Sequence, residues 1–207
     1  FVVIFASSIG LTVWDPMGVT SYVPETQDVE FACLYSFSSS YYSTGDYDNG
    51  GRFATEPDEI ARILNTAKVL HMGLAVDNEP YVLPMNYGYV LEDGKLTLYL
   101  HSAVKGRKLD MIRANSKVSF SIDCDRMPFE GRVACQYGMV YSSVMGKGTA
   151  TIVEDVEEKM QAMSILMKTQ TGKDFTFNER LVSIVAVIRI DVAEYTAKNR
   201  PLPEAMR

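Results

Sequence analysis

The clearest change of hydrophobic period along the chain lies between Lys95 and Asn115. Its first part alternates strictly between apolar and polar positions, and the apolar side consists of Leu96, Leu98 and Leu100. A period of two predicts a strand with one buried face. Leu109 and Ile112 then lie three residues apart, which is the spacing of a helix. The stretch therefore predicts a strand that leads into a short helix ending at Asn115.

An amphipathic helix is predicted to begin at Thr55, a residue suited to the N-cap position. Its apolar positions have helical spacing and are Ile60, Ile63, Leu64 and Ala67. Two strands, Lys68–Val76 and Tyr81–Leu91, are predicted next, with turn-forming residues between them. Together with the strand that begins at Lys95, they predict a three-stranded antiparallel meander.

A fourth strand is predicted over Val118–Asp123, where apolar and polar residues alternate again. A loop with Pro128 should follow, and then a long extended run over Ala134–Val153. Two glycines inside this run, Gly146 and Gly148, indicate a bulge or a sharp bend.

A helix is predicted over Val156–Lys168, and we interpret its methionines as core filler. The last strand is predicted over Val185–Val192, with an irregular tail over Tyr195–Arg207. About six antiparallel strands with interspersed helices predict a mainly β protein, a closed or nearly closed barrel with flanking helices.

The domain organisation is read from composition. Residues 1–52 are predicted to be an N-terminal extension of unknown role that is partly flexible, because a Ser-, Tyr-, Gly- and Asp-rich stretch ends at Gly50–Gly51. Residues 53–207 are predicted to form the globular domain. The apolar opening of the chain is too short to span a bilayer and lacks the basic flank of a signal peptide.

Charge and cysteine content narrow the class of protein. The 207 residues include 20 basic and 26 acidic ones, and residues 1–51 contain acids but no Lys or Arg. The remainder is neutral, which disfavours a nucleic-acid partner. Three scattered cysteines predict neither a disulfide framework nor a metal site, so we expect a cytoplasmic protein with reduced thiols.

Three cations gather at the start of the helix predicted after His101, where the helix dipole favours acidic residues. They are Lys105, Arg107 and Lys108. Backbone N–H groups at a helix start bind anions, so the pattern favours a phosphate ligand. Gly106 would allow close approach of the backbone, Ser102 offers a hydroxyl group, and Arg107 offers a planar pair of donors. The alternative is a solvated basic turn.

His101 directly precedes this turn. Because histidine titrates near neutral pH, His101 is a candidate cofactor contact or proton donor. The alternative is a polar residue at a strand end that is hydrogen-bonded to the backbone. His71 has no such neighbourhood, and we interpret it as structural. Strand tyrosines either line a ring-binding cleft or pack the sheet: Tyr87, Tyr89, Tyr99 and Tyr141.

Four segments of the chain form a recognisable combination: Pro84–Tyr89 (PMNYGY), Leu98–Ala103 (LYLHSA), Gly106–Leu109 (GRKL) and Tyr141–Met145 (YSSVM). In their order and spacing they closely resemble the pyridoxamine 5′-phosphate oxidase-like family. Within it they are most similar to the nitroimidazole-resistance branch of flavin proteins. The combination is specific, although each segment alone is weak. The resemblance covers about Thr55 to Arg200 and leaves residues 1–52 unmatched.

The resemblance implies an FMN-binding split β-barrel, usually a homodimer with FMN in a cleft between the subunits. In the family, the strand matching Leu83–Tyr87 runs past the flavin ring and offers backbone groups to its polar edge. This assigns cofactor contacts to Pro84, Met85, Asn86 and Tyr87.

Further positions are assigned in the same way. His101 and Ser102 match positions near the ribityl-phosphate end of the flavin. Arg107 and Lys108 match the residues that clasp the phosphate, and Lys105 is assigned to the same site.

Ser143 stands where oxidase relatives place a glutamine beside the flavin. Tyr195 and Lys198 resemble a family motif, often Trp-Ser-Gly-Lys, that lies near the cofactor.

One departure from the family restricts the expected reaction. Pyridoxamine-phosphate oxidases have a C-terminal segment with a Trp and a substrate-gripping Arg, whereas Trp14 is the only Trp here and Asn199–Arg207 does not match. We therefore predict an FMN-dependent oxidoreductase that reduces a small acceptor, with nitroaromatic compounds as one candidate class. NADH or NADPH would bind transiently as electron donor, because Gly146–Gly148 is no dinucleotide fingerprint.

Two other functions are compatible with the sequence. Split barrels of this kind also hold haem or a deazaflavin, so one alternative is a non-catalytic flavin, deazaflavin or haem binder. The other is an interaction domain without a ligand.

Overall fold

The computed structural model describes residues 3–7, 10–14 and 52–203 of the chain. The chain divides into two units, 1–40 and 41–207, which are described separately. In the first unit, strands β1 (Val3–Ser7) and β2 (Gly10–Trp14) form an antiparallel hairpin. The predicted linker around Gly50–Gly51 lies outside the described residues, and the predicted boundary at residue 52 stays a prediction.

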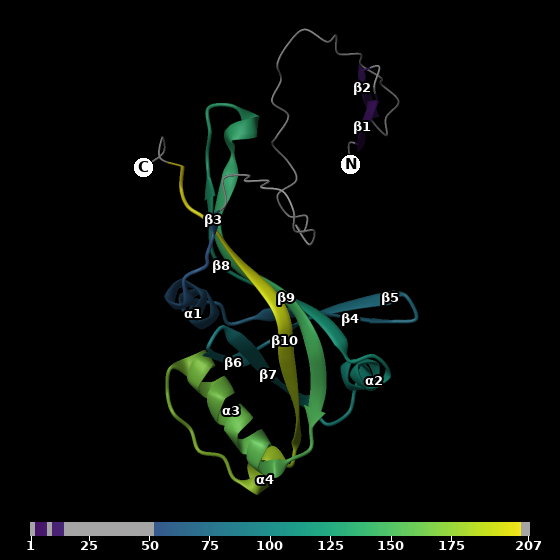
Figure 1. Ribbon diagram of the computed structural model, residues 1–207, viewed down its shortest axis with the longest axis vertical. Coiled ribbons are helices and arrows are strands. Elements are labelled where there is room, and N and C mark those ends of the chain that lie inside the picture. The colour runs from purple at the N-terminus through teal and green to yellow at the C-terminus, as the bar shows by residue number, and fades with distance from the viewer. Residues whose placement is uncertain (1–2, 8–9, 15–51, 204–207) are drawn as a thin grey trace. The chain divides into compact units, whose positions relative to one another are not determined.

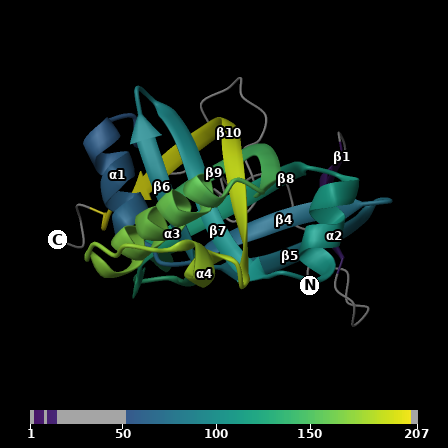
Figure 2. The same ribbon diagram turned by 90° about the horizontal axis from the view of Figure 1, so that it is seen from below.

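The second unit is built on one antiparallel sheet (Figures 1 and 2). Its strands follow the order β5 (Glu79–Met85), β4 (Leu70–Val76), β8 (Lys117–Phe129), β9 (Gly138–Val153), β10 (Val185–Arg200), β7 (Lys95–Ala103) and β6 (Tyr87–Glu92). A two-residue strand, β3 (Arg52–Phe53), pairs with β10. The predicted antiparallel, mainly β fold with flanking helices is confirmed.

The predicted meander is wrong, because the strand predicted over Tyr81–Leu91 is two strands. It breaks at Asn86, and the halves β5 and β6 lie at opposite ends of the strand order. The side-chain amide of Asn86 donates to the carbonyl of Lys68 at 3.0 Å and to Gln170 Oε1 at 3.2 Å. Gln170 in turn donates to the carbonyl of Tyr87 at 2.7 Å. These hydrogen bonds stabilise the bend between β5 and β6, the two strands at the ends of the strand order.

Two other strands are longer than predicted. β8 continues through Pro128, which was expected in a loop, and β10 continues to Arg200 through a tail that was expected to be irregular. The cause is the central strand β9, which pairs with β8 as far as Gly138 and with β10 as far as Tyr141. Figure 1 shows β8, β9 and β10 rising together toward β3.

Two local predictions need smaller corrections. The first helix, α1 (Pro57–Thr66), has Glu56 rather than Thr55 as its N-cap. The extended run predicted from Ala134 begins with a short 3₁₀ helix, η1 (Ala134–Gln136).

The bulge predicted from Gly146 and Gly148 exists, but it lies in the partner strand. The register of β10 against β9 shifts between Val192 and Glu194, opposite the two glycines. A Cβ on Gly146 would lie 2.7 Å from the carbonyl oxygen of Glu194. The glycines therefore make room for the bulged backbone of β10.

Helices complete the core. α1 supplies its predicted apolar stripe, α2 (Arg107–Ala114) supplies Leu109 and Ile112, and strand side chains such as Leu98 and Ile188 fill the interior. α3 (Val156–Thr171) and α4 (Glu179–Val182) cover a second cluster outside the sheet: Val153, Ala162, Met163, Val182 and Val187. α3 lies against β6 and β7, and α2 lies beside β4 (Figure 2). Met163 lies in this cluster and the half-buried Met160 packs against it, so the interpretation as core filler is confirmed for these two methionines.

Strand β5 forms one edge of the sheet and contains two prolines, Pro80 and Pro84. Proline has no backbone N–H, and in sheets it is confined to edges, strand starts and bulges. The position of β5 in the sheet thus follows from its sequence.

Candidate functional site

The predicted cations do gather at the start of α2. Gly106 is the N-cap with φ of 147°, Arg107 and Lys108 begin the helix, and Lys105 precedes the cap. A Cβ on Gly106 would meet nothing within 4 Å, so the backbone there is accessible. We call Lys105–Lys108 the cationic turn.

The charge of the cationic turn is only partly neutralised. The guanidinium of Arg107 lies 4.7 Å from the centroid of the Tyr81 ring and 3.8 Å from Glu79 Oε2, and both charged side chains are exposed. Within residues 52–203, neither Lys105 nor Lys108 forms an ion pair. The turn therefore retains positive charge beside free helix N–H groups, which is the chemistry that an anionic ligand needs.

His101 and Ser102 point to opposite sides of β7. The hydroxyl of Ser102 is buried in the barrel and donates to the carbonyl of Ala103 at 2.9 Å. His101 pairs with Val187, a member of the cluster beneath α3 and α4. Its Nδ1 is buried and has no hydrogen-bond partner in the described part of the chain. Of these two residues, only His101 has an unused polar atom.

The strand segment predicted to run past the flavin uses most of its side chains internally. Met85 belongs to the core, and the amide of Asn86 holds the strand break. Tyr87 is fully buried, and its hydroxyl donates to the carbonyl of Leu64 at 2.8 Å. Pro84 and Asn86 are exposed, and the Asn86 amide already donates to two internal partners. A cofactor contact from this segment would therefore come from the backbone or from these two side chains, and it stays a prediction.

The hydroxyl of Tyr87 also lies 3.2 Å from the carbonyl of Ala67, so it serves the C-terminal end of α1. We expect Tyr87→Phe to lower the free energy of unfolding by about 1–3 kcal/mol, because buried carbonyls lose their donor. Urea unfolding of Tyr87→Phe measures the loss, with Tyr137→Phe, at an exposed tyrosine, as control. Equal stability of Tyr87→Phe and the unchanged protein would contradict this assignment.

Four side chains form a row across the far part of the sheet, which we call the outer row: Phe53, Lys198, Ser143 and Asp123. Each is the direct cross-strand partner of the next, so all four point to the same side. The ammonium of Lys198 lies 4.8 Å from the centroid of the Phe53 ring. The outer row brings together Ser143 and Lys198, which were both predicted to lie beside the flavin.

Within one chain, Ser143 and His101 pair with opposite ends of β10. His101 pairs with Val187 and Ser143 with Lys198, so the two positions are 198 − 187 = 11 residues apart along β10. At about 3.3 Å per residue this is roughly 35 Å of strand. The long course of β10 is visible in Figure 1. The predicted site residues thus form two groups: His101 with the cationic turn, and the outer row.

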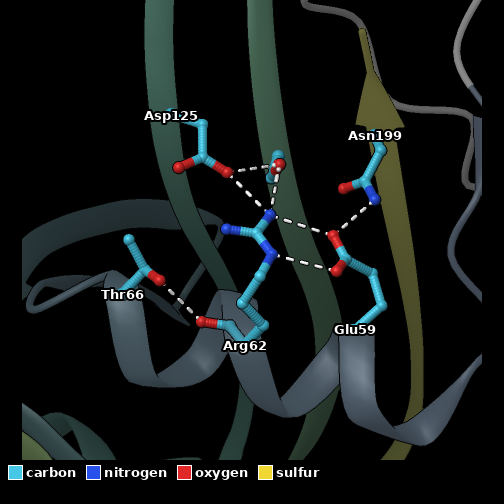
Figure 3. A network of polar contacts seen from close by, with 6 residues as sticks. Glu59, Arg62, Thr66, Asp125 and Asn199 are labelled. Carbon is cyan, nitrogen blue, oxygen red and sulfur yellow. Dashed lines mark hydrogen bonds and ion pairs between the residues drawn. The ribbon is translucent and has the colours of Figure 1, made fainter.

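A polar network lies next to the outer row, and the sequence did not predict it (Figure 3). The guanidinium of Arg62 on α1 donates to Glu59 at 2.9 Å, to Asp125 at 2.7 Å and to Ser142 Oγ at 3.0 Å. Glu59 also accepts from Asn199 Nδ2 at 2.6 Å. We call these five residues the Arg62 network. Only the i,i+3 spacing of Glu59 and Arg62 was visible in the sequence.

The Arg62 network predicts a loss of stability in acid. Hydrogen bonds from Arg62 lower the pKa of Glu59 from its ordinary 4.5 and that of Asp125 from its ordinary 3.8. Because both pKa values are lower in the folded state, the stabilisation is present above about pH 5 and is lost as the pH falls through the folded-state values. Urea unfolding at pH 7 and at pH 3.5 should show a smaller loss for Arg62→Met than for the unchanged protein. An equal loss would contradict the prediction.

Cys124 lies beside this network but is not a reactive thiol. Burial raises the pKa of Cys124 to about 12, so thiolate is scarce at neutral pH. Among the described residues, no group of three or more His, Cys, Asp or Glu could hold a metal ion. No helix in the described ranges has the length and apolar character needed to cross a membrane.

A family model described as pyridoxamine 5′-phosphate oxidase matches residues 56–199. The chain belongs to the pyridoxamine 5′-phosphate oxidase family. The match runs from the N-cap of α1 to Asn199 near the end of β10, so it includes the cationic turn, the strand break and all of the outer row except Phe53. The resemblance inferred from the four sequence segments is confirmed.

Solved structures share the fold. A candidate 5-nitroimidazole antibiotic resistance protein from Bacteroides thetaiotaomicron is 31% identical, with a TM-score of 0.61, and the match covers 72% of this chain and 86% of that one. An FAD- and haem-binding protein from Mycobacterium smegmatis (TM-score 0.62, 15% identity, 72% and 74% covered) shares the fold. So does the flavocytochrome Anf3 from Azotobacter vinelandii (TM-score 0.62, 18% identity, 80% and 76% covered). Among curated proteins, none matches the sequence.

Proposed function

We propose that this family member is a homodimeric, cytoplasmic flavoprotein that binds FMN and transfers electrons from NADH or NADPH to a small acceptor. The observation that carries the proposal is the cationic turn. It presents Lys105, Arg107 and Lys108 at a helix start, with little internal neutralisation. The 31% identity to a candidate nitroimidazole resistance protein makes nitroaromatic compounds the first acceptors to test.

The residues present fit FMN. The cationic turn would hold the phosphate, and His101 has a buried Nδ1 without a partner in the described part of the chain. The strand break at Asn86 leaves Pro84 and nearby backbone groups for the ring. Bound FMN would supply the two-electron redox chemistry, while the protein would bind and orient it and exclude water.

The two groups of predicted site residues support a dimer. The positions on β10 that pair with His101 and Ser143 are separated by roughly 35 Å of strand, which is longer than FMN. If both residues contact FMN, a second copy of the chain would supply the outer row. We therefore propose that each cofactor site takes His101 and the cationic turn from one protomer and Ser143 from its partner.

The absorption spectrum of the purified protein tests the proposal. Flavin bands are expected, and anaerobic addition of NADH or NADPH should bleach them. Reoxidation by a nitroaromatic compound would complete the reaction. A Soret band would favour the haem-binding alternative, flavin that resists reduction would favour a non-catalytic binder, and a colourless protein that takes up no FMN would contradict the proposal.

A further inference from the structure

Arg62 connects α1 to three strands through a single guanidinium group. It contacts Asp125 on β8 and Ser142 on β9 directly, and it reaches Asn199 on β10 through Glu59 (Figure 3). Ser142 also donates to Asp125 at 2.7 Å. One network of hydrogen bonds therefore joins β8, β9 and β10 to one another and to α1.

The residues bonded to Arg62, directly or through Glu59, are next in sequence to residues of the outer row. Ser142 precedes Ser143, Asn199 follows Lys198, and Ser142 and Asn199 are themselves cross-strand partners. Successive strand residues point to opposite faces of a sheet. By holding the inner residues, Arg62 therefore sets the position of the backbone that presents Ser143 and Lys198 on the other face.

The backbone near Asp125 is irregular. Asp125 has φ of 59°, which aspartate tolerates, and the β8–β9 register shifts between Cys124 and Met127. Hydrogen bonds from Arg62 and Ser142 hold the Asp125 carboxylate at this point of the strand. Without Arg62, the carboxylates of Asp125 and Glu59 would lose their shared cation, and their mutual repulsion would act against the present spacing of α1 and β8.

We propose that Arg62 is a positioning residue for the cofactor site of the partner protomer. It touches no ligand itself but fixes Ser143 and Lys198, which one copy supplies to the FMN bound at the cationic turn of the other. This inference rests on the proposed function, because it needs both FMN and the dimer.

Mixed dimers test this arrangement. One chain has Arg62→Met, and the other has Arg107→Ala together with Lys108→Ala; different tags allow the mixed dimer to be purified. Each variant alone should bind FMN about tenfold or more weakly, the scale seen when groups that orient ligand-binding residues are replaced. The mixed dimer should recover one site of unchanged affinity, formed by the intact cationic turn of the first chain and the intact outer row of the second.

Several outcomes would overturn the inference. If Arg62 acted within its own chain, the mixed dimer would have no intact site. If it acted on stability alone, Arg62→Met would bind FMN normally once folded. An unchanged protein that binds no FMN would instead contradict the proposed function.

A second arginine provides a matched control. Arg189 contacts Glu158 at 2.6 Å and Asp191 at 3.1 Å, so Arg189→Met also removes a guanidinium from between two carboxylates. It should lose stability but not FMN affinity. Without FMN, hydrogen exchange should speed up at residues 141–145 and 195–200 in Arg62→Met and not in Arg189→Met. If Arg62→Met does not fold, Arg62→Lys keeps the charge without the planar fork and should weaken FMN binding less.

Discussion

Replacing Arg107 and Lys108 together with alanine will weaken FMN binding by roughly two orders of magnitude. Each contact between a charged donor and phosphate contributes about 1.5–3 kcal/mol, so losing both costs about 3 kcal/mol or more. Neither side chain has a strong partner among the described residues, where Arg107 pairs with Glu79 at 3.8 Å and Lys108 forms no ion pair. The fold should therefore survive the change. Fluorescence titration with FMN measures the effect.

Riboflavin, which lacks the phosphate, makes this test selective. Its affinity should change little in the double variant, because the cationic turn would have no phosphate to hold. Arg113→Ala provides the protein control: it removes an arginine from the same helix, but one that pairs with Asp110 at 2.9 Å. Equal losses for FMN and riboflavin would show that the turn supports the fold rather than the phosphate.

Gly88→Ala will destabilise the protein by about 1–3 kcal/mol or more, because the added methyl group has no space. A Cβ on Gly88 of β6 would lie 2.5 Å from the Cα and 2.6 Å from the backbone nitrogen of Leu166 on α3. Backbone atoms cannot turn aside as a flexible side chain can, so α3 would have to move away from the sheet. Urea unfolding of the variant measures the loss.

Gly94→Asn is the matched control for this prediction. Gly94 has φ of 74°, a conformation that asparagine tolerates, and a Cβ there meets nothing within 4 Å. Its cost should be well below that of Gly88→Ala. Equal stability of Gly88→Ala and the unchanged protein would show that the contact between α3 and β6 can relax at no cost.

The sequence was sufficient for the elements whose pattern is local. The alternation of Leu96, Leu98 and Leu100 predicted β7, and the cations before Leu109 predicted the unusual start of α2, because both signals lie within a few residues. The break at Asn86 could not be predicted, since it depends on Lys68 and Gln170, which are distant in sequence. The length of β10 likewise depends on pairing with β9 rather than on its own residues.

The sequence was enough to predict which residues belong to the candidate site, but not how they are arranged in space. The family motifs indicated His101 and Ser143, yet only the strand register shows that they lie at opposite ends of β10. The Arg62 network had no distinctive sequence signal, because its members come from α1, β8, β9 and β10. Long-range polar contacts of this kind become visible only when the strands are aligned.

The prolines of β5 also restrict how copies of the chain can associate. A free strand edge with a full set of N–H groups can recruit further strands and so start the growth of fibrils. Pro80 and Pro84 interrupt that set of donors along β5. Continuous strand-to-strand pairing along this edge is therefore disfavoured, which protects the protein against the addition of further strands there.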